Sequence, residues 1–330
     1  MKIQMKLAWG VSALVLILGG GWWLFDRSPN AKTDSIKLQQ EWFPYAGYAG
    51  ECEAVRLAAL ENIAIELIPG SESVDPIKLV LSGAADFGVA GADLVIGANA
   101  KGADLLVIGT INNISPTCFV VKSDSGIKSP TDFVGKKVGV LPGTNTERVY
   151  NLLMRRQSID RRKINEIPVP FDLQTFVLGQ YDVRPAFIYD EPVSLDLKSI
   201  SYELIKPSDF GVKFVGTVYF TRKDLIAEHP EKVQILIDYL RKGWDSALAN
   251  PKNAIDTLAS QFDGIDKNRE LKALERGIPY FSGEGGVLKS SQDNWQQTIS
   301  GMEDLGEIPK GKVSIGEILN ESFLNKAKGK

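Results

Sequence analysis

The segment from Lys136 to Pro192 places the tightest limit on the fold, because strand-like and helix-like patterns alternate within it. It begins with an apolar strand pattern around Val138, followed by a polar turn and a helical pattern from Asn145. It ends with a second apolar run, residues 185–189, which stops at Asp190-Glu191-Pro192. In α/β proteins, strand ends and helix starts are where ligands bind, because backbone N–H groups and short polar side chains converge there. The segment therefore predicts an α/β fold with a cleft for a small molecule.

The same alternation extends over most of the chain. One group of strand and helix patterns runs from Ile36 to Val121, a second runs to Phe214, and a return strand near 215–221 precedes a mostly helical remainder. Such βαβ units produce mostly parallel sheets with helices on both faces. We therefore expect a two-lobed α/β protein, with residues 36–121 and 215–330 forming lobe 1 and residues 122–214 forming lobe 2.

Three local expectations belong to this plan. Residues 36–42 alternate like a strand at an exposed sheet edge. The strand at 117–121 is expected to complete lobe 1. A last helix is expected at about 315–327.

The N-terminus has the pattern of a targeting segment. Lys2 and Lys6 precede a run without charged residues from Leu7 to Phe25, and a basic start before an apolar core is typical of export. The run is close to the roughly 20 residues that span a bilayer. Residues 1–25 are therefore either a cleaved signal peptide or an uncleaved membrane anchor, and residues 26–35 a linker. We expect the protein in the periplasm or on the extracytoplasmic face of the cytoplasmic membrane.

Composition excludes several classes of function. With a net charge of −3 and no basic stripe, the 330-residue chain does not have the character of a nucleic-acid-binding protein. It has one histidine and two cysteines, so no Cys/His zinc set or Ser-His pair is available unless His229 is recruited. We expect His229 to lie exposed at a helix start, and Cys52 and Cys118 to be buried and unpaired. The composition predicts no catalytic residue, metal or cofactor.

A loop rich in aromatic residues is the first candidate site. Trp42, Phe43, Tyr45 and Tyr48 follow a strand pattern and precede a helical one. Core packing can account for two of these rings, but a loop this aromatic favours a pocket, because flat rings stack on flat ligands. Together with the preceding acid, Glu41, the loop gives the candidates Glu41, Trp42, Tyr45 and Tyr48.

Polar residues at strand ends and helix starts give the remaining candidates. The turn Gly143-Thr144-Asn145-Thr146 leads into a helix, and it either only caps that helix or also holds a polar ligand group. Tyr189-Asp190-Glu191 ends a strand, so an acid there either caps the next helix or accepts a hydrogen bond from a ligand N–H. Ser71, Asp93 and Ser115 lie at similar places, where ordinary turn chemistry is the alternative.

Several motifs together carry a family resemblance. They are Trp42-Phe43-Pro44, Ala46-Gly47-Tyr48, Asp75-Pro76-Ile77-Lys78, Ser82-Gly83-Ala84-Ala85-Asp86-Phe87-Gly88-Val89, Gly135-Lys136-Lys137-Val138-Gly139-Val140, Gly143-Thr144, Phe171-Asp172-Leu173 and Asp190-Glu191-Pro192. In these motifs the chain resembles periplasmic substrate-binding proteins of ABC importers, in the group that also holds thiamine-pyrimidine precursor proteins. The resemblance covers about residues 36–280.

The resemblance implies a type II periplasmic binding fold, two hinged lobes that close on one solute and deliver it to a permease and its ATPase. It implies a monomer that binds a flat nitrogen heterocycle of the aminopyrimidine or flavin type. By this similarity, Trp42 stacks on the ligand, Glu191 bonds a heterocyclic amino group, and Phe171 and Tyr189 join the site.

Departures from that group leave other functions open. The pyrimidine-binding pattern often has Asp or Asn near Glu41 and a histidine after Pro44, where this chain has Tyr45. Anion binders for nitrate, sulfonate or taurine are one alternative, although a cleft with many carboxylates would repel a bare anion. A pyrimidine synthase, which uses a histidine and a cysteine cluster, is a second, and a membrane-tethered sensor is a third.

Overall fold

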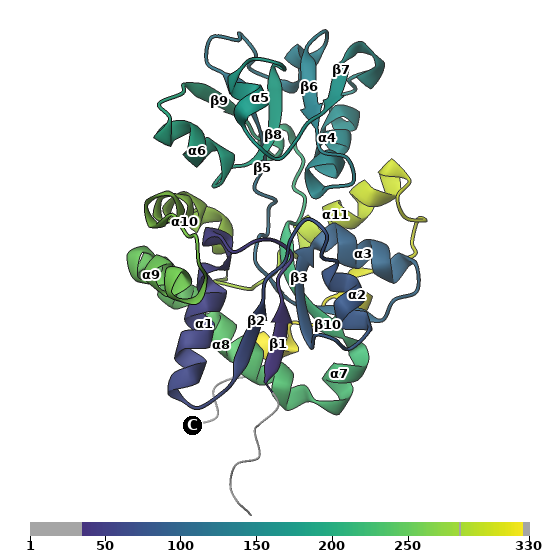
Figure 1. Ribbon diagram of the computed structural model, residues 1–330. Coiled ribbons are helices and arrows are strands. Elements are labelled where there is room, and N and C mark those ends of the chain that lie inside the picture. Colours follow the sequence, from purple (N-terminus) through teal and green to yellow (C-terminus); the bar gives the residue numbers. More distant parts are fainter. Residues whose placement is uncertain (1–34, 284, 326–330) are drawn as a thin grey trace, which may run out of the picture. The chain divides into compact units, whose positions relative to one another are not determined.

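The computed structural model describes residues 35–283 and 285–325, which belong to one compact unit (Figure 1). The expected targeting segment at 1–25 lies outside the described residues, as does the expected linker apart from Ser35. Among the described residues, no helix combines the length and the apolar character that a membrane crossing requires.

The first sheet has five strands in the order β2-β1-β3-β10-β4. They are β1 (Ile36–Gln39), β2 (Ile65–Ile68), β3 (Phe87–Gly91), β4 (Leu105–Thr110) and β10 (Thr217–Arg222). Strand β1 is parallel to β2 and β3, whereas β10 is antiparallel to β3 and β4. The expected edge position of the first strand is wrong, because Leu38 pairs with Leu67 on one side and with Phe87 on the other.

The second sheet also has five strands, in the order β7-β6-β8-β5-β9. They are β5 (Thr117–Lys122), β6 (Lys137–Val140), β7 (Asn165–Pro168), β8 (Val183–Phe187) and β9 (Tyr202–Ile205). Strand β6 is parallel to β7 and β8, and β5 is antiparallel to β8 and β9. Each sheet therefore has four strands in one direction and one reversed strand, and the α/β prediction of mostly parallel sheets is confirmed.

Strand β5 was expected in lobe 1, and this is wrong. It pairs with β8 from Thr117 opposite Phe187 to Val121 opposite Val183, so the chain first crosses to the second sheet between Thr110 and Thr117. A short apolar run buried on both faces suits either sheet, and its local pattern does not specify its hydrogen-bonding partners.

Helices cover the sheets (Figure 1). In the described part of the chain, nine helices follow strands β1 to β3 or lie after β10: α1 (Ala49–Leu60), α2 (Pro76–Leu81), α3 (Ala92–Ala100), α7 (Lys223–Glu228), α8 (Pro230–Ala249), α9 (Pro251–Gln261), α10 (Lys267–Phe281), α11 (Gln292–Leu305) and α12 (Ile315–Ile318). Those of the second sheet are α4 (Asn145–Arg156), α5 (Gln174–Val177) and α6 (Glu191–Leu197). The expected helix at 315–327 is wrong from Leu319 to Asn325, because α12 ends at Ile318 and Leu319 forms a bridge with Val107. Residues 326 and 327 lie outside the described residues.

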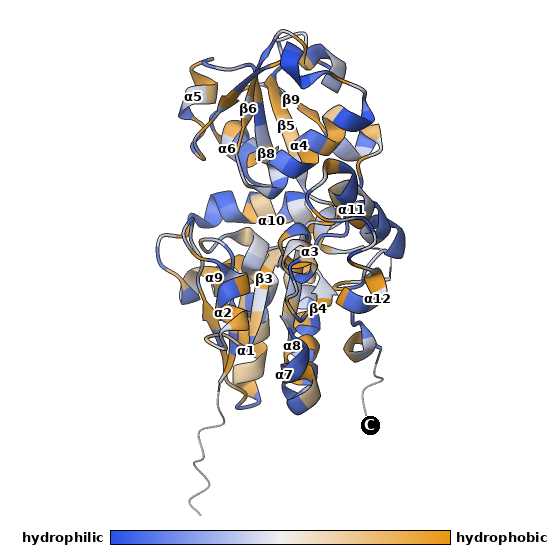
Figure 2. Cartoon of the chain, turned by 90° about the vertical axis from the view of Figure 1, so that its right-hand side faces the viewer, coloured by the Kyte–Doolittle hydropathy of each residue, from blue (hydrophilic) through white to orange (hydrophobic). Residues whose placement is uncertain are grey.

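Both faces of each sheet are buried, as helices on both sides require. On β5, Cys118 and Val120 face one hydrophobic cluster, while Phe119 and Val121 face the other, because successive side chains of a strand point to opposite faces. Figure 2 shows apolar residues along the strands and hydrophilic ones on outer helical surfaces. The apolar continuity of these strands follows from this double burial.

The contact between α1 and α8 depends on small residues. A Cβ atom added to Gly243 on α8 would lie 2.1 Å from the carbonyl oxygen of Gly50 on α1, a separation that no side chain tolerates. The close approach fixes α1, and with it the aromatic loop immediately before that helix.

Three expectations about single residues are confirmed. His229 is the residue before α8, whose first position is Pro230, and its side chain is 54% exposed. Cys52 and Cys118 are buried and unpaired.

Candidate functional site

A cavity of about 290 Å³ lies between the two sheets. Its walls come from the segments after β1, β2, β3, β4, β6 and β7 and from the end of β8 with the turn after it, all at the carboxyl ends of strands. The start of the reversed strand β10 completes them. Open α/β sheets place their ligand crevices at these strand ends. The volume is near the lower limit of about 300 Å³ for small-molecule sites.

All but one of the residues predicted to form the site line this cavity. They are Glu41, Trp42, Tyr45, Tyr48, Ser71, Asp93, Ser115, Gly143, Thr144, Asn145, Thr146, Phe171 and Glu191. Tyr189 is the exception: it is buried, and its ring packs on Phe281 with ring centroids 4.9 Å apart. Tyr189 thus supports the wall from behind, while ligand contact by the others stays a prediction.

Sequence reasoning missed several lining residues. They are Glu72, Val74, Gly91, Leu94, Pro116, Leu141, Pro185, Ala186, Phe187, Asp190, Gly216 and Thr217. Phe187 and Asp190 are next to predicted residues, so the end of the 185–189 run could have indicated them. Thr217 has no local signal, because it reaches the site through the antiparallel pairing of β10 with β3.

Hydrogen bonds fix the aromatic loop before α1. The backbone N–H of Trp42 donates to the Tyr48 hydroxyl at 2.9 Å, and the Trp42 carbonyl accepts from Gly70 N at 3.1 Å. The backbone N–H of Ala46 donates to Glu270 Oε2 at 2.6 Å. The loop is therefore tied to its own helix, to the turn after β2 and to α10.

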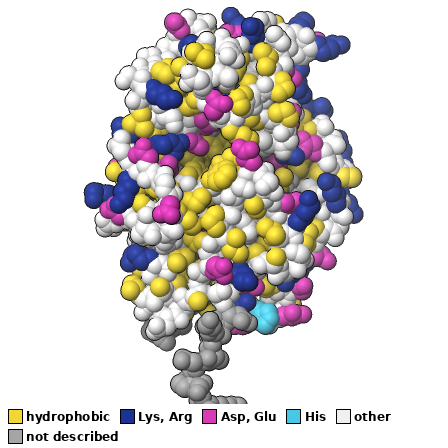
Figure 3. All heavy atoms as spheres, viewed as in Figure 1, with side chains coloured by type: hydrophobic (Ala, Val, Ile, Leu, Met, Phe, Trp, Pro, Cys, Tyr) yellow, Lys and Arg dark blue, Asp and Glu magenta, His cyan; other side chains and the backbone are white. Residues whose placement is uncertain are grey.

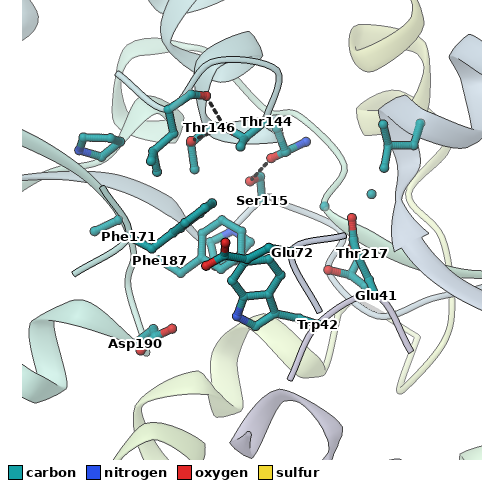
Figure 4. Close-up of a pocket in the computed structure, with 18 of the residues that line it drawn as sticks. Glu41, Trp42, Glu72, Ser115, Thr144, Thr146, Phe171, Phe187, Asp190 and Thr217 are labelled. Atoms are coloured by element: carbon teal, nitrogen blue, oxygen red, sulfur yellow. Dashed lines mark hydrogen bonds between the residues drawn. The ribbon is translucent and has the colours of Figure 1, made fainter. Parts of the chain in front are cut away.

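Trp42 and Phe171 face each other in the cavity from segments that follow strands of different sheets (Figure 4). Their ring centroids are 5.0 Å apart at 52°, and Trp42 also meets Phe43 edge-on at 5.5 Å. Figure 3 shows hydrophobic side chains gathered in the central hollow, with acidic side chains near it. Because Trp42 and Phe171 already touch, a flat ligand on the indole must separate them or use its other face.

The lining includes five carboxylates and no lysine, arginine or histidine: the acids are Glu41, Glu72, Asp93, Asp190 and Glu191. Three of them pair with arginines outside the lining, Asp93 with Arg148 at 2.8 Å, Glu191 with Arg184 at 3.4 Å, and Asp190 with Arg269. Within the described chain, Glu41 and Glu72 have no such ion pair.

Glu41 carries little charge near neutral pH. Burial, and then the negative charge of Asp93, raise the pKa of Glu41 to about 8, although the backbone N–H of Gly91 acts in the opposite direction. At pH 7 the carboxyl is therefore mostly neutral, and it offers one O–H donor beside an acceptor oxygen.

The acids at the start of α6 are held within the chain. Glu191 Oε2 accepts from the backbone N–H of Phe187 at 2.9 Å, and Asp190 makes no side-chain cap of α6. The capping alternative is therefore wrong for Asp190, while the Glu191 carboxyl also accepts from its own backbone N–H in the first turn of α6. Burial and the charge of Asp190 raise the pKa of Glu191 to about 7, while Arg184 acts to lower it.

The helix start at Thr144 is capped, as one alternative proposed. Thr144 Oγ1 accepts from Glu147 N at 3.4 Å, and Glu147 Oε2 accepts from Gly143 N at 2.7 Å. Gly143 and Thr144 also line the cavity. The turn is thus both a helix cap and part of the wall.

Three predicted ligand residues bond to one another between the lobes. Asn145 Nδ2 donates to Asp93 Oδ1 at 3.0 Å, and Ser115 Oγ donates to Asn145 Oδ1 at 3.1 Å. Arg148 occupies the second oxygen of Asp93. Both oxygens of Asp93 therefore already have partners in the chain.

Among the described residues, no group of histidine, cysteine and acidic side chains could hold a metal ion. Burial, the main cause, raises the pKa of both thiols well above its usual range.

We expect neither Cys52 nor Cys118 to react with a thiol reagent such as dithionitrobenzoate in the native protein, because buried neutral thiols are inert. Both should react after unfolding in urea. Absorbance of the released thionitrobenzoate measures this, and a fast-reacting thiol in the native protein would contradict the burial of these side chains.

Comparison with known proteins identifies the family. The family model described as NMT1/THI5 like matches residues 59–254, more than half of the chain. The chain belongs to the NMT1/THI5-like family. Among relatives of this NMT1/THI5-like chain, a 4-amino-5-hydroxymethyl-2-methylpyrimidine phosphate synthase of Legionella pneumophila is 23% identical over 75% of this chain and 80% of that protein. A formylaminopyrimidine-binding protein of Halalkalibacterium halodurans is 22% identical over 84% of this chain and 87% of that protein.

A solved structure similar to this NMT1/THI5-like protein establishes its fold. The periplasmic aliphatic sulphonate binding protein SsuA of Escherichia coli matches with a TM-score of 0.69 and 19% identity, over 86% of this chain and 91% of that chain. The two mixed five-stranded sheets thus form the two-lobed type II periplasmic binding protein fold, and the fold prediction is confirmed.

Proposed function

We propose that this chain is the extracytoplasmic solute-binding protein of an ABC importer. We further propose that it binds a small, flat nitrogen heterocycle, of the aminopyrimidine or flavin type, in the cavity between the lobes. The family supports the first statement. The observation that supports the second is a lining with an aromatic pair, five carboxylates and no cationic side chain.

The charge of the lining disfavours the anion alternative. A nitrate, sulfonate or taurine site needs cations or several free donors to replace water around the anion. Here the nearby arginines, Arg148, Arg184 and Arg269, are paired with lining acids. The similarity to the sulphonate-binding protein SsuA, at 19% identity, shows a shared fold. It is no argument that this chain binds a sulphonate.

The same lining suits an aminopyrimidine. An amino group beside a ring nitrogen presents a donor next to an acceptor, and the neutral carboxyl of Glu41 offers the complementary pair. We propose that Trp42 stacks on the ring and that Glu191 accepts from a ligand amino group. The other lining residues that the sequence predicted would surround the bound ligand.

An enzyme remains the second candidate, because one relative is named as a pyrimidine phosphate synthase. We propose that this chain is not an enzyme and uses no cofactor. Its single histidine, His229, is beside α8 and does not line the cavity, and both cysteines are buried. Mass spectrometry after incubation with candidate ligands separates the two classes, since turnover would support the synthase and unchanged ligand the receptor.

The cellular setting is part of the same proposal. We propose a monomer that works outside the cytoplasmic membrane, tethered through residues 1–25 if they are not cleaved, and that delivers its solute to an ABC permease and ATPase. The genes beside its own test this, because an adjacent permease and ATPase would argue against a membrane-tethered sensor.

Ligand-dependent melting tests the proposed ligand. We expect 4-amino-5-hydroxymethyl-2-methylpyrimidine to raise the melting temperature of the full chain in mild detergent, whereas taurine and nitrate leave it unchanged. A ligand at 100 times its Kd stabilises the folded state by about 2.7 kcal/mol. A shift with taurine or nitrate alone would refute the heterocycle.

Two adjacent aromatic residues, Trp42 and Phe43, provide a test of stacking and its control. Trp42→Ala should weaken binding by roughly 5- to 150-fold, because base stacking on an aromatic ring contributes about 1 to 3 kcal/mol in other proteins. Phe43→Ala should change it far less, because Phe43 is 51% exposed and does not line the cavity. Calorimetric titration of both variants measures the difference.

A further inference from the structure

Arg184 is a fully buried arginine directly behind the cavity. It lies on β8, next to the lining residues Pro185, Ala186 and Phe187, but does not itself line the cavity. Its side chain is 0% exposed. A buried guanidinium is costly unless its charge and its donors are satisfied, so its partners indicate what it does.

Of the four partners that Arg184 has among the described residues, three lie in two segments that reach the cavity, and the fourth is the buried Tyr181. Nη1 donates to the carbonyl of Pro170 at 2.9 Å, and Nη2 donates to the carbonyl of Phe171 at 2.6 Å. Nη2 also reaches Glu191 Oε1 at 3.4 Å, and Nη1 donates to the Tyr181 hydroxyl at 2.9 Å. Within the described chain, Glu191 is the carboxylate that pairs with Arg184.

The loop that bears Phe171 has few other ties. Phe171 is 45% exposed, and it precedes the four-residue helix α5, so neither burial nor a long helix holds it in place. The two carbonyl bonds from Arg184 therefore fix the backbone from which the Phe171 ring reaches Trp42. The planar fork of an arginine suits this role, because its donors diverge in fixed directions.

The same guanidinium influences the charge of Glu191. The titratable groups that act near this carboxyl are Asp190 of the same turn, Arg184 of β8 and Cys118 of β5. Arg269 of α10 is paired with Asp190. Arg184 is therefore the cation in direct contact with Glu191.

We propose that Arg184 is a positioning residue of the binding site, which fixes two ligand-facing groups of the second lobe, the Phe171 ring and the Glu191 carboxylate, without contacting the ligand. The ligand named in this proposal rests on the proposed function. The effect of Arg184 on the loop that bears Phe171 does not depend on any ligand.

The first experiment needs no ligand. Hydrogen exchange of the full chain in mild detergent, followed by mass spectrometry, compares wild type with Arg184→Met. We expect exchange in the segment 169–173 to become at least tenfold faster, mainly at Val169, whose N–H donates to the Val140 carbonyl at 3.0 Å, because without the two carbonyl bonds the backbone that follows Val169 is no longer held. Lys122→Met is the matched control: Lys122 Nζ donates to the Val177 carbonyl at the end of α5, at 3.1 Å, so its loss should leave 169–173 unchanged.

The second experiment measures affinity for 4-amino-5-hydroxymethyl-2-methylpyrimidine between pH 5 and 9. Binding should rise on the acid side as Glu191 loses its proton and fall on the alkaline side as Glu41 does. We expect Arg184→Met to bind at least tenfold more weakly and to shift the acid-side midpoint of binding, which Glu191 sets, upward by one unit or more. Glu191→Gln should abolish that midpoint. Arg184→Lys keeps the charge but not the fork, so it should restore the midpoint and leave 169–173 fast in exchange.

The outcomes separate the two proposals. Unchanged exchange at 169–173 in Arg184→Met, or affinity within twofold of wild type, would overturn the positioning role. If wild type does not bind the pyrimidine, the proposed function fails, while the exchange experiment still decides whether Arg184 fixes this loop. Should Arg184→Met not fold, Arg184→Lys decides by the same exchange criterion.

Discussion

Replacing Glu51 with glutamine is expected to stabilise the protein at pH 9 by roughly 3 to 5 kcal/mol and to change its stability little at pH 5. The carboxyl lies on α1 with 0% exposure and accepts from Gln40 Nε2 at 2.7 Å and from the Tyr219 hydroxyl at 3.0 Å. No cation among the described residues pairs with it. Burial therefore raises the pKa of Glu51 from 4.5 to about 8, despite these two hydrogen bonds.

The sign of the pH dependence follows from proton binding. Between pH 4.5 and about 8 the folded protein keeps a proton on Glu51 that the unfolded chain has lost. Stability is therefore greatest below pH 4.5, as far as this group is concerned, and falls as the pH rises to about 8. A glutamine has no proton to lose, so the variant lacks this decline. Glu41 and Glu191, whose pKa values are also raised, should retain a decline of the same sign in both proteins, so the effect of Glu51 is read from the difference between variant and wild type.

Urea unfolding at pH 5, 7 and 9 measures the effect, with Glu53→Gln as the control on the same helix. Burial acts to raise the pKa of Glu53, but hydrogen bonds from Arg56, Thr257 and Ser246 outweigh it, and the pKa is lowered. The control should therefore be destabilised at pH 7 and 9, opposite to Glu51→Gln. Equal loss of stability in both variants at pH 9 would show that Glu51 is charged and paired in the folded protein.

Removing the guanidinium of Arg148 is expected to destabilise the protein by about 3 to 5 kcal/mol. The side chain of Asp93 is 0% exposed, and Arg148 Nη1 is its cationic partner at 2.8 Å. Arg148 Nε also bonds Glu307 at 2.6 Å. In Arg148→Met, Asp93 would retain only the Asn145 amide, which leaves a buried carboxylate without a counter-charge.

A double-mutant cycle separates the pair from other effects of the substitution. Asp93→Asn combined with Arg148→Met should recover most of the lost stability, because the uncompensated charge is gone. Arg276→Met is the comparison for an exposed pair between the lobes: its partner Asp196 is 41% exposed, so the loss should be about 1 kcal/mol or less. Additive losses in the Asp93 and Arg148 cycle would mean that the two groups do not interact.

Sequence and structure agree best where the pattern is local. The helix from Asn145, the strand around Val138 and the helix start after His229 were all recognisable, because periodicity, capping residues and proline act within a few residues. Strand β9 was missed, and its sequence Tyr202–Ile205 is only four residues long between polar segments.

The candidate site could be predicted as a set of residues but not as a set of contacts. Strand ends and helix starts identified Asp93, Ser115 and Asn145 as site residues, and all three line the cavity. That they bond to one another, and that Asp93 uses its second oxygen for Arg148, depends on segments 30 to 55 residues apart in sequence. No local pattern specifies such a meeting.

The sequence by itself determined the α/β class, the two-lobed plan and most of the side chains around the cavity, because hydrophobic period, turns and caps are local properties of the chain. Only the tertiary structure decided which sheet receives β5, how Thr217 reaches the cavity, which lining acids have arginine partners and that Arg184 joins Phe171 to Glu191. Strand pairing and the electrostatics of buried groups depend on residues distant in sequence, and these are brought together only when the lobes pack.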